Sequence, residues 1–139
     1  MRRLRLLLPL AIVLLLFGCE AQYRDVSSEP KYATRVGERC VVLKGLRAHG
    51  FSNDSRRKDV THEGRITTVA VAGHRITFDV PIQKGITMEV TGVRECVNCP
   101  FDRISYAVVV PGVPELSELK VFAGAEALAP EEVQCTKSR

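Results

Sequence analysis

The chain has 139 residues, with 20 lysines and arginines against 16 aspartates and glutamates. This length is sufficient for one domain with a hydrophobic core and too short for two. Three of the basic residues, Arg2, Arg3 and Arg5, lie at the extreme N-terminus, so the rest of the chain is nearly neutral and gives no support for nucleic-acid binding.

The first eighteen residues have the organisation of a secretory signal peptide. The three arginines precede an apolar run over residues 6–17, broken only by Pro9. A membrane-spanning helix needs about 20 apolar residues, so this run is too short to be one. The sequence Leu16-Phe17-Gly18-Cys19 that ends the run resembles the lipobox of bacterial lipoproteins. The resemblance implies removal of residues 1–18 and attachment of acyl chains such as palmitate to Cys19, which would anchor the mature chain in a lipid bilayer.

The residue after the predicted lipidation site bears on the location of the protein. The enterobacterial sorting rule that the resemblance implies retains a lipoprotein in the inner membrane when aspartate follows the lipidated cysteine. Glu20 occupies this position. We therefore expect the anchor in the outer membrane, with the domain facing the periplasm.

Residues 20–37 are polar and have neither helical nor strand periodicity, which is typical of a flexible tether. The chain is thus expected to have three parts. Residues 1–18 are the signal peptide, residues 19–37 are the lipidated cysteine and its tether, and residues 38–139 are a single disulfide-bonded domain.

The pattern after residue 38 predicts a mainly β domain. Strands are expected at residues 40–43, 64–71, 74–80, 86–90, 104–110 and, as a short sixth, 119–121. Ala72 and Gly73 predict a tight hairpin turn between the second and the third of these. Spacings near ten residues favour a small antiparallel β-barrel or sandwich, somewhat similar to an oligonucleotide- or oligosaccharide-binding barrel. Residues 125–133 predict a short C-terminal helical turn that begins at Pro130.

Four cysteines remain after Cys19 is lipidated, and in an oxidising compartment they predict two disulfides. The favoured pairs are Cys40–Cys135 and Cys96–Cys99, while crossed pairs such as Cys40–Cys96 with Cys99–Cys135 stay open. Closing the long loop would contribute about 4.7 kcal/mol in the chain-entropy estimate, and closing the short one only about 1.9 kcal/mol. The first bond would be the main staple, and the second would be the more easily reduced.

Two other chemistries are available to Cys96 and Cys99. A dithiol at this spacing can exchange disulfides, although the thioredoxin fold requires a long helix after it and a strand is predicted here. All four cysteines could instead form a four-thiolate zinc site. Because thiols oxidise in this compartment, we expect disulfides and no bound metal or cofactor.

The polar stretch over residues 48–63 is predicted to be a long loop and is the candidate binding loop. Its candidate contact residues are His49, Phe51, Arg56, Arg57 and His62. Phe51 is interpreted as a contact anchor or as a lid over one end of the barrel. The two histidines are interpreted as solvent-facing side chains or, alternatively, as ligands that meet across the loop.

No glycine-flanked nucleophile, phosphate-binding loop or recognisable carboxylate pair is present in the sequence. We therefore expect no enzyme activity. The expected function is that of a non-catalytic, lipid-anchored periplasmic module that contacts an envelope protein, peptidoglycan or a small ligand. The main alternative is a thiol–disulfide redox protein or sensor that uses Cys96 and Cys99, and the third is a metal-binding envelope protein.

Overall fold

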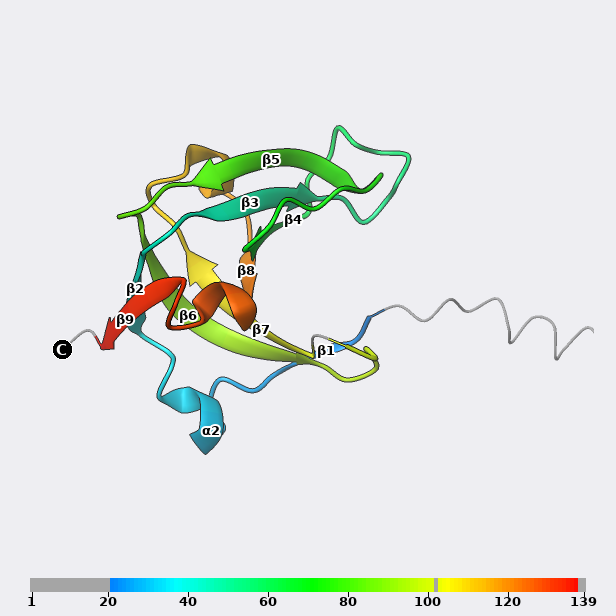
Figure 1. Cartoon of the computed structure of the whole chain (residues 1–139). Coiled ribbons are helices and arrows are strands. Elements are labelled where there is room, and N and C mark those ends of the chain that lie inside the picture. The colour runs from blue at the N-terminus through cyan, green and yellow to red at the C-terminus, as the bar shows by residue number, and fades with distance from the viewer. Residues whose placement is uncertain (1–20, 102, 138–139) are drawn as a thin grey trace, which may run out of the picture.

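A computed structural model describes residues 21–101 and 103–137 (Figure 1). The predicted signal peptide, Cys19 and Glu20 lie outside the described residues. The described part is mainly β and contains one α-helix and two short 3-10 turns. Within these residues, no helix has the length and apolar composition that crossing a bilayer would require.

Nine strands in the described part of the chain belong to one sheet. The elements are β1 (Tyr23–Asp25), α2 (Pro30–Ala33), β2 (Glu38–Val42), β3 (Leu46–Phe51), β4 (Glu63–Thr67), β5 (Ile76–Ile82), β6 (Thr87–Cys96), β7 (Ile104–Val109), η1 (Pro114–Leu116), β8 (Val121–Gly124), η2 (Glu126–Leu128) and β9 (Val133–Lys137). Their order across the sheet is β5-β3-β4-β8-β7-β6-β2-β9, and β1 pairs with β6.

The sheet is bent, so that β5, β3 and β4 lie opposite β6, β2 and β9 (Figure 1). Every pairing is antiparallel except that of β4 with β8, which is parallel. Strands β5 and β9 end the order of described strands and do not pair with each other. The mainly β prediction is therefore confirmed, whereas the described sheet is open rather than closed into a barrel, and it is not antiparallel throughout.

The hydrophobic core fills the space between the two halves of the bent sheet. Leu46 and Ala48 of β3, Ile66 of β4 and Met88 and Val90 of β6 are all almost completely buried. They occupy alternate positions of their strands, as expected when one face of a strand packs on a core. Burial of one large apolar side chain contributes about 1.5–3 kcal/mol to the stability of the fold. The face of each strand that carries these side chains is therefore held against the core, and the opposite face lies outside.

The hairpin predicted between residues 64–71 and 74–80 is wrong. Strands β4 and β5 do not pair with each other, because β3 lies between them and pairs with both. Part of the predicted loop at residues 48–63 is thus a strand. Glycine is required at position 50 of β3, because a Cβ atom there would overlap the Thr77 hydroxyl and the Phe78 ring of β5.

The predicted tether also differs from the structure where it is described. Strand β1 pairs with residues 94–96 of β6, and the Val26 N–H donates a hydrogen bond to the Val93 carbonyl at 2.9 Å. Val26 is only 1% exposed. Helix α2 follows, with Pro30 in its first turn, where the missing N–H of proline costs nothing. Residues 22–37 therefore belong to the folded domain.

The C-terminal region is partly as predicted. Strand β8 lies close to the predicted short strand, and η2 supplies a helical turn within residues 125–133. Pro130 does not begin a helix, however, because it lies after η2 and before β9. Strand β9 was not predicted, and it pairs with β2 at the edge of the sheet.

The structure confirms both favoured disulfides. Cys40 and Cys135 are directly opposite each other in the β2–β9 ladder, with their Cα atoms 3.9 Å apart. Cys96 and Cys99 close the turn that follows β6. The first bond joins elements 95 residues apart, and the second joins residues only three apart.

We expect the double substitution Cys40→Ser and Cys135→Ser to lower the free energy of unfolding by about 4.7 kcal/mol, because the denatured chain regains the entropy that the long loop removes. The matched control is Cys96→Ser with Cys99→Ser, for which the expected loss is about 2 kcal/mol. Urea unfolding followed by circular dichroism measures both. Equal losses of unfolding free energy in the two variants would contradict the prediction that Cys40–Cys135 is the more stabilising disulfide.

Candidate functional site

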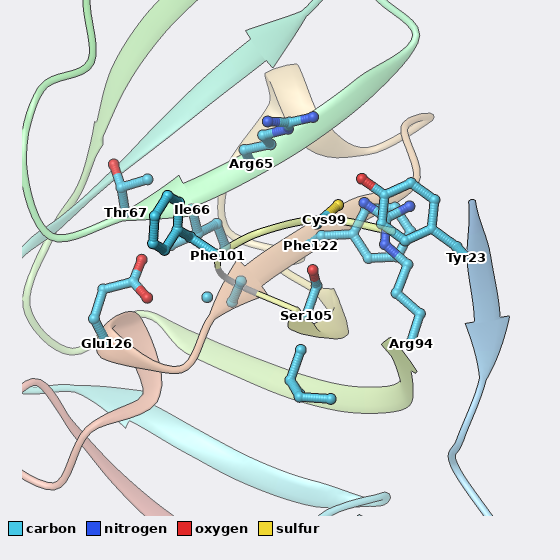
Figure 2. A pocket seen from close by; sticks show the side chains of 13 residues that line it. Tyr23, Arg65, Ile66, Thr67, Arg94, Cys99, Phe101, Ser105, Phe122 and Glu126 are labelled. Carbon is cyan, nitrogen blue, oxygen red and sulfur yellow. The ribbon is translucent and has the colours of Figure 1, made fainter. Parts of the chain in front are cut away.

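A groove of about 270 Å³ lies on the outer face of the sheet, where β4, β8, β7 and β6 meet β1 and the turn at residues 97–101 (Figure 2). Both polar and aromatic side chains line it. They include Tyr23, Arg65, Arg94, Ser105, Phe122 and Glu126. They come from strands that are distant in the sequence, so only the folded sheet creates this surface.

Arg94 is the central charged residue of the groove. Its guanidinium carbon lies 4.0 Å from the centre of the Tyr23 ring and 3.2 Å from that of the Phe122 ring, so the group is stacked between two aromatic faces (Figure 2). Such contacts contribute about 0.5–2 kcal/mol each, depending on desolvation. The Arg94 side chain is only 18% exposed, and its buried Nε atom has no hydrogen-bond partner among the described residues.

A β-bulge places Arg94 on this face. The β6–β7 register shifts between Val90 and Gly92, so the chain gains one residue and the inside–outside alternation is reversed beyond that point. Val90 and Val93 both face the core, although strict alternation would put them on opposite faces. Arg94 consequently points outward, where it meets Phe122 of β8.

The Glu63 carboxylate contacts Arg94 and also a second arginine of the groove, Arg65. The Arg65 Nε atom lies 2.8 Å from Glu63 Oε1, while Arg94 Nη2 lies 3.4 Å from Glu63 Oε2. The Arg65 guanidinium also stacks on the Phe51 ring, at 3.8 Å from its centre. Because Glu63 bridges the two guanidinium groups and Glu126 also lines the groove, the groove carries balanced charge together with donors, acceptors and aromatic surface.

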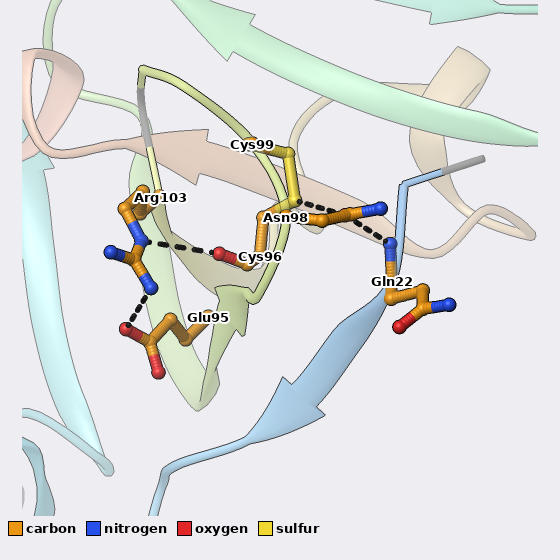
Figure 3. The surroundings of a disulfide bond; sticks show 6 residues. All are labelled: Gln22, Glu95, Cys96, Asn98, Cys99 and Arg103. Carbon is orange, nitrogen blue, oxygen red and sulfur yellow. Dashed lines mark hydrogen bonds and ion pairs between the residues drawn. A yellow bond between two sulfur atoms is a disulfide. The ribbon is translucent and has the colours of Figure 1, made fainter. Parts of the chain in front are cut away.

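Cys99 of the Cys96–Cys99 disulfide lines this groove (Figure 2), and Figure 3 shows the surroundings of the bond. Cys96 is fully buried, whereas Cys99 is partly exposed and lines the groove. The turn is tied to the N-terminal segment, because the Gln22 N–H donates to Asn98 Oδ1 at 2.8 Å and the Val97 N–H donates to the Gln22 carbonyl at 2.8 Å. Strand β7 begins at Ile104, so the arrangement lacks the long helix of a thioredoxin active site.

The cysteines do not form the four-thiolate site considered from the sequence. Cys40 pairs across the ladder with Met88, near one end of β6, and Cys96 ends that strand. Eight residues of β-strand span about 25 Å, so the two disulfides are far apart. Glu38 has a carboxylate oxygen within 4.8 Å of the Cys40 and Cys135 sulfurs, but both sulfurs are in a disulfide and are not the free thiolates that a metal site requires.

Two residues of the predicted binding loop have structural positions instead. His49 lies in β3 and is 1% exposed, with its Nε2 atom 2.9 Å from Thr67 Oγ1 and its Nδ1 atom 3.5 Å from Asp79 Oδ1. The pKa of the Asp79 carboxyl is held below its ordinary value, chiefly by a hydrogen bond from Arg47. Phe51 is also in β3, half-buried beneath Arg65. Both residues therefore belong to β3 and not to the loop that follows it.

The remaining residues of that prediction lie between β3 and β4. His62 accepts a hydrogen bond at Nδ1 from the Asn53 N–H at 3.1 Å, so the two histidines have different partners and are not brought together as ligands. Arg56 and Arg57 are exposed, and each pairs with a neighbouring aspartate, Asp54 or Asp59. This loop is a solvated surface with locally neutralised charge.

The groove was missed in the sequence for identifiable reasons. Tyr23 lies in the presumed tether, and Arg94 is displaced to the outer face by the bulge. Phe122 carries the one available signal, because it alternates with the buried Val121 and Ala123 and must therefore face outward. Comparison of the chain with protein-family models, with curated proteins and with solved structures finds no match.

Proposed function

We propose that the protein is a lipid-anchored, non-catalytic binding module of the bacterial cell envelope and that the groove holds its ligand. The observation that carries the proposal is the composition of the groove. Arg65, Glu63 and Arg94 form a bridged network beside the rings of Tyr23 and Phe122. A few fixed polar groups among aromatic side chains are typical of binding sites.

The size and charge of the groove favour a segment of a large partner. Its volume of about 270 Å³ is below the range of about 300–1,000 Å³ that pockets for drug-sized ligands occupy. The carboxylate of Glu63 offsets guanidinium charge, so a polar ligand without strong net charge fits better than a polyanion. A glycan or peptide strand of peptidoglycan has this character. An envelope protein or a small ligand are the other partners that we predict from the sequence.

The anchoring part of the proposal depends on Leu16-Phe17-Gly18-Cys19 and on Glu20. Acylated Cys19 would attach the domain to the periplasmic face of the outer membrane, within reach of the cell wall. We also propose a sandwich-like description of the bent sheet. The likeness to an oligosaccharide-binding barrel stays a prediction.

The groove can be tested by filling it. Ser105 lines the groove, whereas Val109 lies on the same face of β7, is 51% exposed and does not line it. We expect Ser105→Tyr to abolish co-sedimentation of the protein with purified peptidoglycan, because the added ring occupies the ligand's place. The matched control Val109→Tyr should bind as the wild type does.

Equal sedimentation of both variants would show that peptidoglycan binds elsewhere. If the wild type does not sediment, peptidoglycan is excluded as the ligand. A photo-crosslinker at position 105 then tests for a protein partner, with position 109 as its control.

The anchor is tested by the intact mass of protein taken from native envelopes. We expect two or three acyl chains on Cys19 and the loss of residues 1–18, because the lipobox resemblance implies both. We expect Cys19→Ser to leave an unacylated chain. A wild-type mass without acyl chains would contradict the proposal.

A second candidate function, thiol–disulfide exchange, is favoured by one observation. Cys99 is partly exposed in the groove while Cys96 is buried, so one sulfur is accessible to an attacking thiolate. An exchange protein must lose its function with either single substitution, since the second thiol resolves the mixed disulfide.

The binding module predicts a different result for the same residues. Cys96→Ser with Cys99→Ser should keep the fold and peptidoglycan binding, with a stability loss of about 2 kcal/mol. Alkylation followed by mass measurement gives an independent test. Labelling of Cys96 and Cys99 under reduction too mild to open Cys40–Cys135 would favour the redox function.

A further inference from the structure

Two apolar side chains project from the turn that follows β6. Phe101 is 80% exposed and Val97 is 51% exposed, and Phe101 is the most exposed of the large apolar residues in the described part of the chain. Because both side chains belong to one five-residue turn, they form a small exposed apolar surface, and exposed apolar surfaces mark sites where a protein or a membrane binds.

The position of the turn close to the N-terminal segment indicates what covers Val97 and Phe101. The turn is hydrogen-bonded to Gln22 through Val97 and Asn98, and Tyr23 is directly opposite Cys96 in the ladder. Gln22 follows Cys19 by three positions, and three residue steps reach at most about 11 Å. A lipid anchor at Cys19 would therefore hold this turn at the surface of the bilayer.

The turn is also held in shape, and the Phe101 side chain lines the groove while most of its surface stays exposed (Figure 2). The Cys96–Cys99 disulfide closes it. The Arg103 Nε atom donates a hydrogen bond to the Cys96 carbonyl at 3.3 Å, and its guanidinium also lies 3.3 Å from Glu95 (Figure 3). The Arg103 side chain is 52% exposed, which leaves it accessible to a lipid phosphate.

We propose that the turn at residues 97–101 is a membrane-contact surface, which seats Val97 and Phe101 in the interfacial region of the bilayer that holds the acyl chains. This inference rests on the proposed lipidation of Cys19. Apolar side chains beside an acyl anchor add buried area to membrane binding, and tethering raises their effective concentration at the bilayer. The turn thereby fixes the orientation of the domain, with the part of the groove that Cys99 and Phe101 line next to the membrane.

The sequence contains no tryptophan, so a single introduced tryptophan reports its own environment. The test uses the full precursor with Phe101→Trp, expressed with its signal peptide, purified from membranes and reconstituted. The vesicles contain phosphatidylethanolamine and phosphatidylglycerol with brominated acyl chains. Val109→Trp is the matched control, because Val109 is also apolar, is 51% exposed and ends β7, whereas the turn precedes the start of that strand.

We expect a blue-shifted emission and the loss of most fluorescence to the brominated lipid for Phe101→Trp, and neither effect for Val109→Trp. The intact mass of the same samples is measured first. With acyl chains present, an unquenched Phe101→Trp, or equal quenching of both variants, overturns the membrane-contact surface and leaves the lipid anchor in place. Without acyl chains, the proposed anchor itself is overturned, and the membrane-contact surface with it.

Discussion

The pairing of β6 with three other strands is the interaction on which the rest of the structure depends. One edge of this ten-residue strand pairs with β7, while the other edge is shared between β2, opposite residues 87–89, and β1, opposite residues 94–96. Buried backbone groups must find hydrogen-bond partners, and β6 supplies them to the N-terminal segment and to the strand that carries Cys40. Without β6, both disulfides and one wall of the groove would lose their support.

The bulge in β6 divides the strand into two functional halves. Before it, Met88 and Val90 pack into the core with the Cys40–Cys135 staple, and this half stabilises the domain. After it, Arg94 faces outward and Cys96 begins the closed turn. A single inserted residue thus allows one strand to serve the core at one end and the proposed ligand and membrane surfaces at the other.

Most of the strands could be predicted from the sequence, but the order in which they pair in the sheet could not. Strands β2, β6 and β7 contain alternating or continuous β-branched residues, which indicate a strand locally. Strand β3 contains Ala48, His49 and Gly50, whose small or polar character indicates a loop until the Phe78 ring of β5 is packed against Gly50. The spacing of the cysteines favoured the observed disulfide pairs, but the crossed pairs stayed open until the β2–β9 ladder placed Cys40 opposite Cys135. The groove depends on a bulge and on a three-residue strand, neither of which leaves a periodic signal.

The parallel pairing of β4 with β8 has a consequence for how the domain is assembled. Strand β8 is inserted between β4 and β7, although β5, β6 and β7 all lie between β4 and β8 in the chain. A nascent chain that ends before residue 121 therefore has a gap in the middle of its sheet, and its two halves present open edges to other chains. Contacts between residues so far apart in sequence slow folding. The domain can complete its sheet only after nearly all of the polypeptide is available, and such a delay would suit the export across a membrane that we propose.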